Sequence, residues 1–181
     1  MSATPQFKLR SLGKFQEAPR ESWTPAQIEV AIPFEQRRGT VPAPFRLFLS
    51  SAPFAKRMQA LSDYVLRNGL FSSDEVEVAV LTAAAHLKFD FVAVAHRKIA
   101  AAAGVPQAAI DAILAGQVPA FANKRHEAVY LCARAMLTRT DAFDSVIAVI
   151  GQDGACEIAG ILGFYCTCGF TLEFFEVPNP E

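Results

Sequence analysis

The chain has 181 residues, of which 52% are hydrophobic and only 19% are charged. Its 17 basic and 18 acidic side chains leave a net charge of −1, so the sequence lacks the basic footprint expected of a nucleic-acid-binding protein. This length predicts a single domain with a sizeable core, and the apolar excess indicates surface buried between subunits or around a dry interior pocket.

The N-terminal residues 1–21 show no apolar periodicity and are predicted to form an irregular arm before one domain over residues 22–181. They also lack the apolar segment of a signal peptide, which favours a cytoplasmic protein. The tetrapeptide Thr-Pro-Ala-Gln at 24–27 is typical of a helix start, with an N-cap, a first-turn proline and a capping-box glutamine. A break is expected at 39–44, where two prolines hold the backbone extended.

Apolar side chains at helical spacing predict most of the remaining chain to be helical. Ser72 and Glu75 have capping-box spacing, and Asp90 is predicted to be the N-cap of the helix that contains His96. No alternating run predicts a strand, so the expected fold class is all-α. The predicted helices after the break cover residues 44–50, 52–68, 73–87, 90–103, 106–114, 123–138, 142–150 and 154–171.

The longest uncharged stretch runs from Ile158 to Leu172 and is 15 residues long. A membrane-spanning helix needs roughly 18 or more such residues, and this stretch also contains three glycines. We therefore predict a helix buried in the core or against another subunit, and no membrane span.

Four cysteines, Cys132, Cys156, Cys166 and Cys168, are predicted to be reduced and buried because the chain carries no export signal. The last two are two residues apart on a predicted helix, where their side chains point to different faces. The three histidines show neither H-x-x-x-H nor H-E-x-x-H spacing. No metal site and no cofactor are predicted.

Glu77 lies in an otherwise apolar helical segment, and His96 lies about two turns into the next predicted helix. If these helices pack together, the two side chains could meet. A carboxylate fixes the tautomer of a histidine and stabilises its charged form, so the pair could act as a general acid/base. The alternative is an exposed Glu77 and a purely structural His96, and residue types alone favour this alternative.

The run E-V-A-V-L-T-A-A-A-H from Glu77 to His86, followed by H-R-K-I-A-A-A-A-G-V from His96, resembles the carboxymuconolactone decarboxylase family and its AhpD-like alkylhydroperoxidase relatives. The resemblance extends over residues 22–180. It implies an AhpD-like helical domain, a small-molecule substrate, and a homo-oligomer such as a trimer, hexamer or dimer. Further matching landmarks lie at residues 44–53, 119–121, 163–165 and 174–178.

The resemblance also implies a loss of the relatives' redox residues. Glu77 and His96 match the Glu and His of the peroxidase branch, whereas Phe89 and Val92 stand at its two cysteine positions and Phe91 at its tyrosine position. Longer relatives carry a Glu where Val92 stands. Because thiol-based peroxide reduction needs a thiolate, that activity is not expected here.

Two functions remain open. The first is a decarboxylase-like lyase for a small carboxylated lactone or related aromatic-degradation intermediate. In it His96 would be the acid/base, Glu77 would orient His96, and Arg46 or Lys88 would hold a substrate carboxylate. The alternative for Arg46 and Lys88 is that each is an exposed charge that does not bind substrate.

The second function is a small-molecule-binding or structural oligomer without catalysis. Its pocket would be apolar and lined by Phe89, Phe91 and Val92. His86 matches a histidine of the longer relatives, and it either lines this pocket or satisfies a backbone carbonyl near the helix end.

Overall fold

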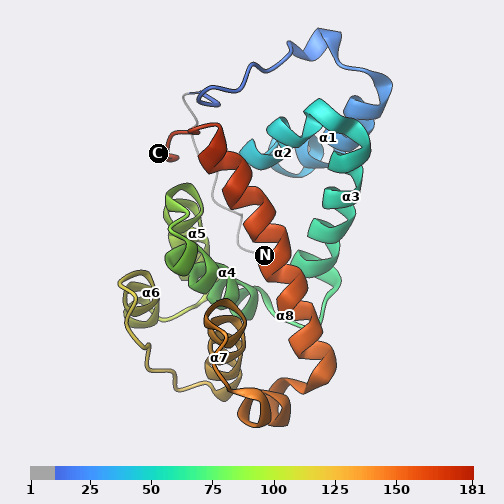
Figure 1. Ribbon diagram of the computed structural model, residues 1–181. Helices are drawn as coiled ribbons and strands as arrows, with labels where there is room; N and C mark the ends of the chain where they lie inside the picture. Colours follow the sequence, from blue (N-terminus) through green and yellow to red (C-terminus); the bar gives the residue numbers. More distant parts are fainter. Residues whose placement is uncertain (1–10) are drawn as a thin grey trace.

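The computed structural model describes residues 11–181, and every regular element in that range is a helix, which confirms the all-α prediction (Figure 1). Residues 1–10 of the predicted arm lie outside the described part. The elements are η1 (Arg20–Ser22), α1 (Pro25–Arg38), α2 (Ala43–Phe48), η2 (Leu49–Ser51), α3 (Ala52–Asp63), the π-helical turn η3 (Tyr64–Asn68), α4 (Ser73–Leu87), α5 (Asp90–Ala103), α6 (Gln107–Leu114), α7 (Lys124–Thr138) and α8 (Phe143–Phe174).

Local sequence signals place the starts of α1 and α4 correctly. At the start of α1, the backbone N–H of Thr24 donates to Gln27 Oε1 over 2.8 Å, and the N–H of Gln27 donates to Thr24 Oγ1 over 3.4 Å. The helix ends at Gly39, whose φ of 71° is the left-handed conformation that glycine adopts without strain. At the start of α4, Ser72 N–H donates to Glu75 Oε2 over 3.0 Å.

Helix α4 is the central element of the fold. It packs against α5, α6, α7 and α8, and residues 75–84 are all buried. The alanines at Ala79, Ala83 and Ala84 allow the neighbouring helices to approach closely. This central position explains why Glu77, a charged residue, is only 4% exposed.

Helix α8 bends at Gly151, whose φ of 72° and ψ of 176° are essentially restricted to glycine. The bend lies in the predicted break between residues 150 and 154. Beyond it, the C-terminal segment crosses the molecule with α1, α2 and α3 on one side and α5 and α7 on the other (Figure 1).

Two local predictions are wrong. Phe89, not Asp90, is the N-cap of α5, and Asp90 is the first residue inside the helix. Cys132 and Cys168 are buried as predicted, but Cys156 is exposed and Cys166 is half-buried. Cys156 and Cys166 both lie on α8, and the side of this helix that faces away from the core is also apolar.

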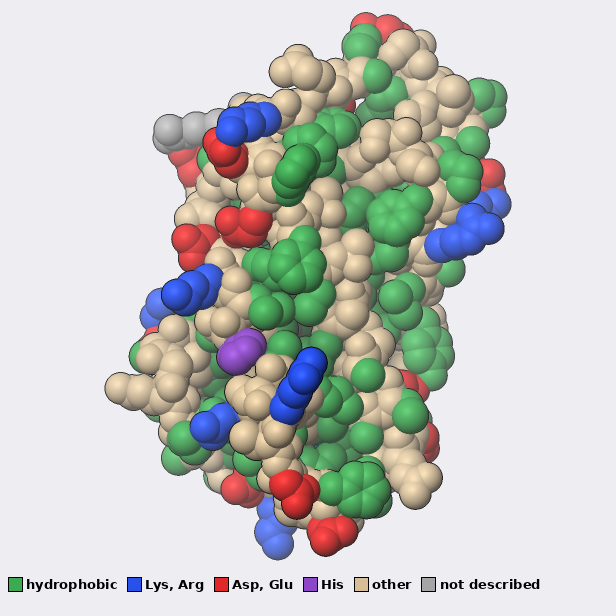
Figure 2. All heavy atoms as spheres, viewed as in Figure 1, with side chains coloured by type: hydrophobic (Ala, Val, Ile, Leu, Met, Phe, Trp, Pro, Cys, Tyr) green, Lys and Arg blue, Asp and Glu red, His purple; other side chains and the backbone are tan. Residues whose placement is uncertain are grey.

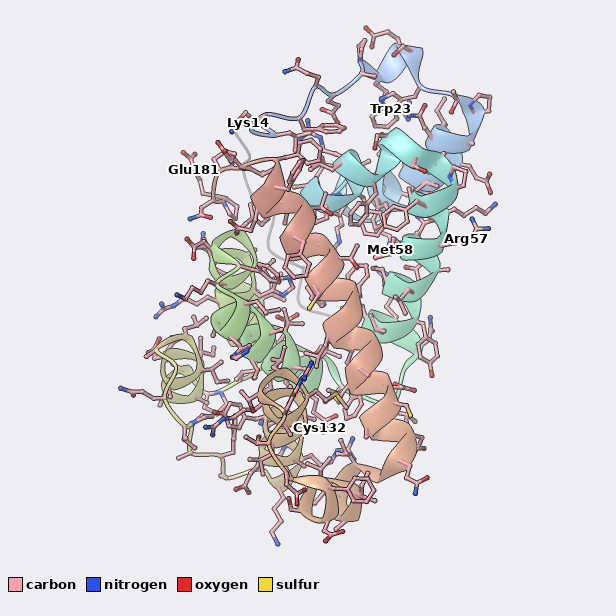
Figure 3. All side chains as sticks on the ribbon, in the orientation of Figure 1. Lys14, Trp23, Arg57, Met58, Cys132 and Glu181 are labelled. Carbon is pink, nitrogen blue, oxygen red and sulfur yellow. The ribbon has the colours of Figure 1, made fainter. Side chains whose placement is uncertain are left out.

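The described part of the N-terminal arm returns to the end of α8. The backbone N–H of Lys14 donates to the carbonyl of Phe175 over 2.7 Å, and the ring of Phe15 meets that of Phe175 edge to face with centroids 5.2 Å apart. Figure 3 shows Lys14 beside this end of α8. It also shows Met58 on the side of α3 that faces α8 and Arg57 pointing away. The arm is therefore attached to the domain.

Within residues 11–181, α8 is the one helix long and apolar enough to cross a membrane by length and composition, and 33% of its most apolar window is buried. A core helix of a soluble protein passes the same test, so this is weak evidence for a membrane span.

Candidate active site

A cavity of about 520 Å³ opens between the α1–α2 connection, the α3–η3 segment, the first turns of α4, helix α5 and the second half of α8. Most of its wall is apolar, a composition typical of small-molecule sites. Its larger apolar side chains are Phe34, Val41, Phe45, Leu66, Phe91, Val92, Ile99, Phe164 and Leu172.

Glu77 and His96 meet at the wall of this cavity. Glu77 Oε2 lies 2.7 Å from His96 Nδ1, and the two side chains are 5% and 14% exposed. Within the described residues, no buried side-chain nitrogen or oxygen lacks a hydrogen-bond partner. Among residues 11–181, the bond at Nδ1 is the only hydrogen bond of this ring, so Nε2 is accessible to the cavity that His96 lines. The pair thus presents one free ring nitrogen to a ligand.

Tyr165, from α8, packs against this histidine. The two rings meet edge to face, with centroids 4.8 Å apart and an interplanar angle of 88°. Burial raises the pKa of the Tyr165 phenol well above its usual value. The charge of Glu77 and, to a smaller extent, Cys168 raise this pKa further, whereas the positive charge of Arg38 lowers it. The phenol is therefore neutral at physiological pH and available as a hydrogen-bond donor.

Arginines line the polar side of the cavity. Burial lowers the pKa of the Arg38 guanidinium, and the nearby charge of Arg67 lowers it further, while Tyr165 and Glu77 favour the charged form. Arg67 forms an ion pair with Asp63, so its charge is already compensated. An arginine remains protonated in such a setting, so Arg38 supplies positive charge near Glu77.

Arg46 also reaches the cavity, but Glu17 of the arm holds it. Its Nε donates to Glu17 Oε1 over 2.8 Å, and its terminal nitrogen bonds the other carboxylate oxygen. The bond to Glu17 raises the pKa of Arg46. A substrate carboxylate would have to compete with this two-point contact.

Cys168 is the cysteine of the cavity wall. Burial raises the pKa of its thiol far above the usual range, and the neighbouring Cys166 adds to the shift. The sulfur is therefore a neutral thiol rather than a nucleophilic thiolate. Within residues 11–181, no three His, Cys, Asp or Glu side chains lie together in a way that could hold a metal ion.

The structure brings five of the predicted site residues to the cavity: Glu77, His96, Phe91, Val92 and Arg46. The other predicted residues lie elsewhere.

Phe89 points away from the cavity, lies against Gly169 and meets Phe170 edge to face at 5.0 Å. His86 and Lys88 are exposed near the end of α4 and do not line the cavity. Placing Phe89 in the pocket was wrong because it precedes the first turn of α5 and faces α8.

Sequence reasoning missed Arg38, Tyr165 and Cys168 as cavity residues. Arg38 follows another arginine at a helix end, where a cation is ordinary, and the other two belong to a long apolar run. No local signal distinguishes them, because they join the site only when the tertiary fold brings α1, α5 and α8 together around the cavity.

No protein-family model matches the chain, and no curated protein matches its sequence. Solved structures match it in fold. An uncharacterized peroxidase-related protein from Silicibacter sp. has a TM-score of 0.76 at 10% identity, with 96% of this chain and 94% of that chain covered. A peroxidase-related protein from Ralstonia eutropha, described as an alkylhydroperoxidase AhpD core, has a TM-score of 0.75 at 14% identity, with 95% and 94% covered.

The chain has an AhpD-like fold. The debrominase Bmp8 in complex with 2,3,4-tribromopyrrole is a further structure of similar shape, with a TM-score of 0.72, 16% identity, and 94% of this chain and 93% of that chain covered. Identities this low show the AhpD-like fold alone, and that part of the sequence-based expectation is confirmed. The narrower resemblance to carboxymuconolactone decarboxylases stays a prediction.

Proposed function

We propose that this protein is a lyase that decarboxylates a small, largely apolar carboxylic acid, such as a carboxylated lactone, in the cavity beside His96. The observation that supports the proposal most directly is the 2.7 Å contact between Glu77 Oε2 and His96 Nδ1 at the cavity wall. A histidine held in this way has a fixed orientation and one nitrogen free for proton transfer.

The reaction needs one proton donor. When the bond between the substrate carbon and its carboxylate breaks, CO2 leaves and the electron pair stays on the substrate, delocalised onto a conjugated carbonyl as an enolate. The protonated His96 then gives its Nε2 proton to the carbon and becomes neutral. Glu77 accepts a hydrogen bond from Nδ1–H throughout, which stabilises the charged ring before the transfer.

The rest of the cavity supports this chemistry over thiol chemistry. Phe91 and Val92 provide an apolar wall for the substrate body, and Arg38 supplies positive charge toward its anionic end. Cys168 is held as a neutral thiol, so peroxide reduction of the alkylhydroperoxidase kind is not proposed.

The test is turnover of a carboxylated lactone, measured as CO2 release. We expect His96→Ala to lower kcat by about 10²- to 10⁴-fold, the usual contribution of a general acid. His86→Ala is the matched control because His86 is exposed and lies outside the cavity, and its rate should equal that of the wild type. Equal rates for the wild type and His96→Ala would exclude His96 as the acid.

The second candidate is a small-molecule-binding oligomer without turnover. The predominantly apolar cavity wall favours this alternative, because such a wall suits a hydrophobic ligand. In that case an apolar ligand would bind with equal affinity to the wild type and His96→Ala, and no product would form.

A further inference from the structure

The orientation of the Tyr165 ring is fixed by contacts on two sides. His96 meets it edge to face at 4.8 Å, and Phe164 meets it edge to face at 5.1 Å with an interplanar angle of 87°. The residue is 5% exposed, so its ring is packed rather than free to turn. The hydroxyl therefore has a defined position in the cavity wall.

The Tyr165 hydroxyl has no hydrogen-bond partner among residues 11–181, although its residue is buried. No buried side-chain oxygen in that range is left unsatisfied, so this oxygen is open to the cavity instead. Tyrosine hydroxyls in protein interiors normally find a partner. A buried tyrosine with its hydroxyl directed at a cavity points to a partner that the ligand supplies.

The surroundings select a negatively charged oxygen as this partner. The hydroxyl is a neutral donor, and the positive charge of Arg38 acts on the same region. Glu77, the nearby carboxylate, is engaged by His96. A neutral donor and a cation together stabilise an oxyanion, especially where water is largely excluded.

We propose that the Tyr165 hydroxyl is a second catalytic group of this site, donating a hydrogen bond to the oxyanion that forms on the substrate as CO2 leaves. The inference rests on the proposed function. Tyr165 keeps its proton, the electron pair released from the broken bond resides on the enolate oxygen, and His96 delivers the proton to carbon. The substrate class is thereby narrowed to acids whose carboxylate is attached to a carbon that is bonded to a carbonyl group, so that the released electron pair forms an enolate.

The test uses 4-nitrophenol, whose ionised form is a coloured oxyanion of suitable size. The wild type should bind 4-nitrophenolate in preference to the neutral phenol, which lowers the apparent pKa of the bound probe. Tyr165→Phe should bind the anion at least about tenfold more weakly, the usual loss for a hydrogen bond to a charged group. Titration followed by the probe's visible absorbance measures both quantities.

Tyr130→Phe is the matched control, since Tyr130 is a buried tyrosine of α7 that does not line the cavity, and its probe binding should equal that of the wild type. Tyr165→Phe should fold normally because it removes no hydrogen bond to any of residues 11–181. Equal binding by Tyr165→Phe, or no anion binding by the wild type, overturns the inference. Loss of anion binding in Tyr165→Phe together with no CO2 release by the wild type would instead reject the decarboxylase proposal and keep the oxyanion site.

Discussion

At the scale of single residues, the contact between Phe89 and Gly169 determines how closely α5 approaches α8. A Cβ atom placed on Gly169 would overlap the ring of Phe89, which is 3% exposed and also packs on Phe170. The buried ring cannot swing away without opening space in the core. The glycine therefore allows α8 to lie close enough for its Tyr165 to reach His96.

Gly169→Ala should lower the free energy of unfolding by about 1–3 kcal/mol through this overlap. Gly163→Ala is the control on the same helix, because nothing lies within 4 Å of an added Cβ there. That control should be neutral or more stable by up to about 1 kcal/mol, since alanine favours a helix more than glycine does. Urea denaturation measures both, and equal stability of Gly169→Ala and the wild type would contradict the packing argument.

The site could be predicted only where its residues carry a local signal. Glu77 is an acid in an apolar run, and His96 belongs to a run that resembles known relatives, so their contact was predictable. Tyr165 and Arg38 come from distant helices and look ordinary in sequence. Their role depends on tertiary packing, which local patterns do not encode.

At the scale of elements, an ion pair and a histidine–carboxylate hydrogen bond link the start of α4 to the start of α7. Arg125 bonds Glu75, with Nε to Oε1 at 2.5 Å, and His126 Nε2 lies 2.7 Å from Asp74 Oδ2. Burial raises the pKa of Glu75, but bonds from Arg125 and from the backbone of Ser72 lower it more, so the net pKa lies below the usual value.

Because the pKa of Glu75 is lower in the folded state than in the unfolded state, the free energy of unfolding depends on pH in the acidic range. The contribution of Glu75 is present above its unfolded pKa of about 4.3 and is lost as the pH falls through the lower folded value. Glu75→Gln keeps a capping side chain but cannot titrate. It should be less stable than the wild type near neutral pH, and this difference should shrink below about pH 4.

Urea denaturation at both pH values checks this prediction. Glu127→Gln, at an exposed acid in the first turn of α7, should leave the pH dependence of the wild type unchanged. A stability difference between Glu75→Gln and the wild type that stays constant with pH would show that the Glu75–Arg125 pair does not act through ionisation.

At the scale of the whole molecule, the outward side of α8 carries apolar surface that the single chain does not cover (Figure 2). Phe170 is 60% exposed and Phe174 is 78% exposed. On the same helix, Gly163 has no side chain, and nothing lies within 4 Å of the place where a Cβ atom would be. Exposed apolar surface of this kind marks an interaction site. The high apolar content of the sequence is consistent with a partner at this surface, and we propose a second copy of the chain.

The protein should therefore sediment as an oligomer at low micromolar concentration. Phe174→Lys should shift the population toward monomer, because it places a charge in the proposed contact. Val118→Lys is the control, since Val118 is 68% exposed in the loop before α7, and the oligomer should persist in that variant. A wild-type monomer in the same experiment would reject the proposed assembly.

The cavity walls come from segments that are far apart along the chain: the α1–α2 region, α5 and the second half of α8. The cavity therefore exists only after the last of these long-range contacts has formed, and a molecule that occupies it binds the folded chain and not the unfolded one. By mass action, a ligand at a hundred times its Kd adds about 2.7 kcal/mol to the free energy of unfolding. A rise in melting temperature thus identifies compounds that fit the cavity before any reaction is known, and acids with a carbonyl group β to the carboxylate are the first to try.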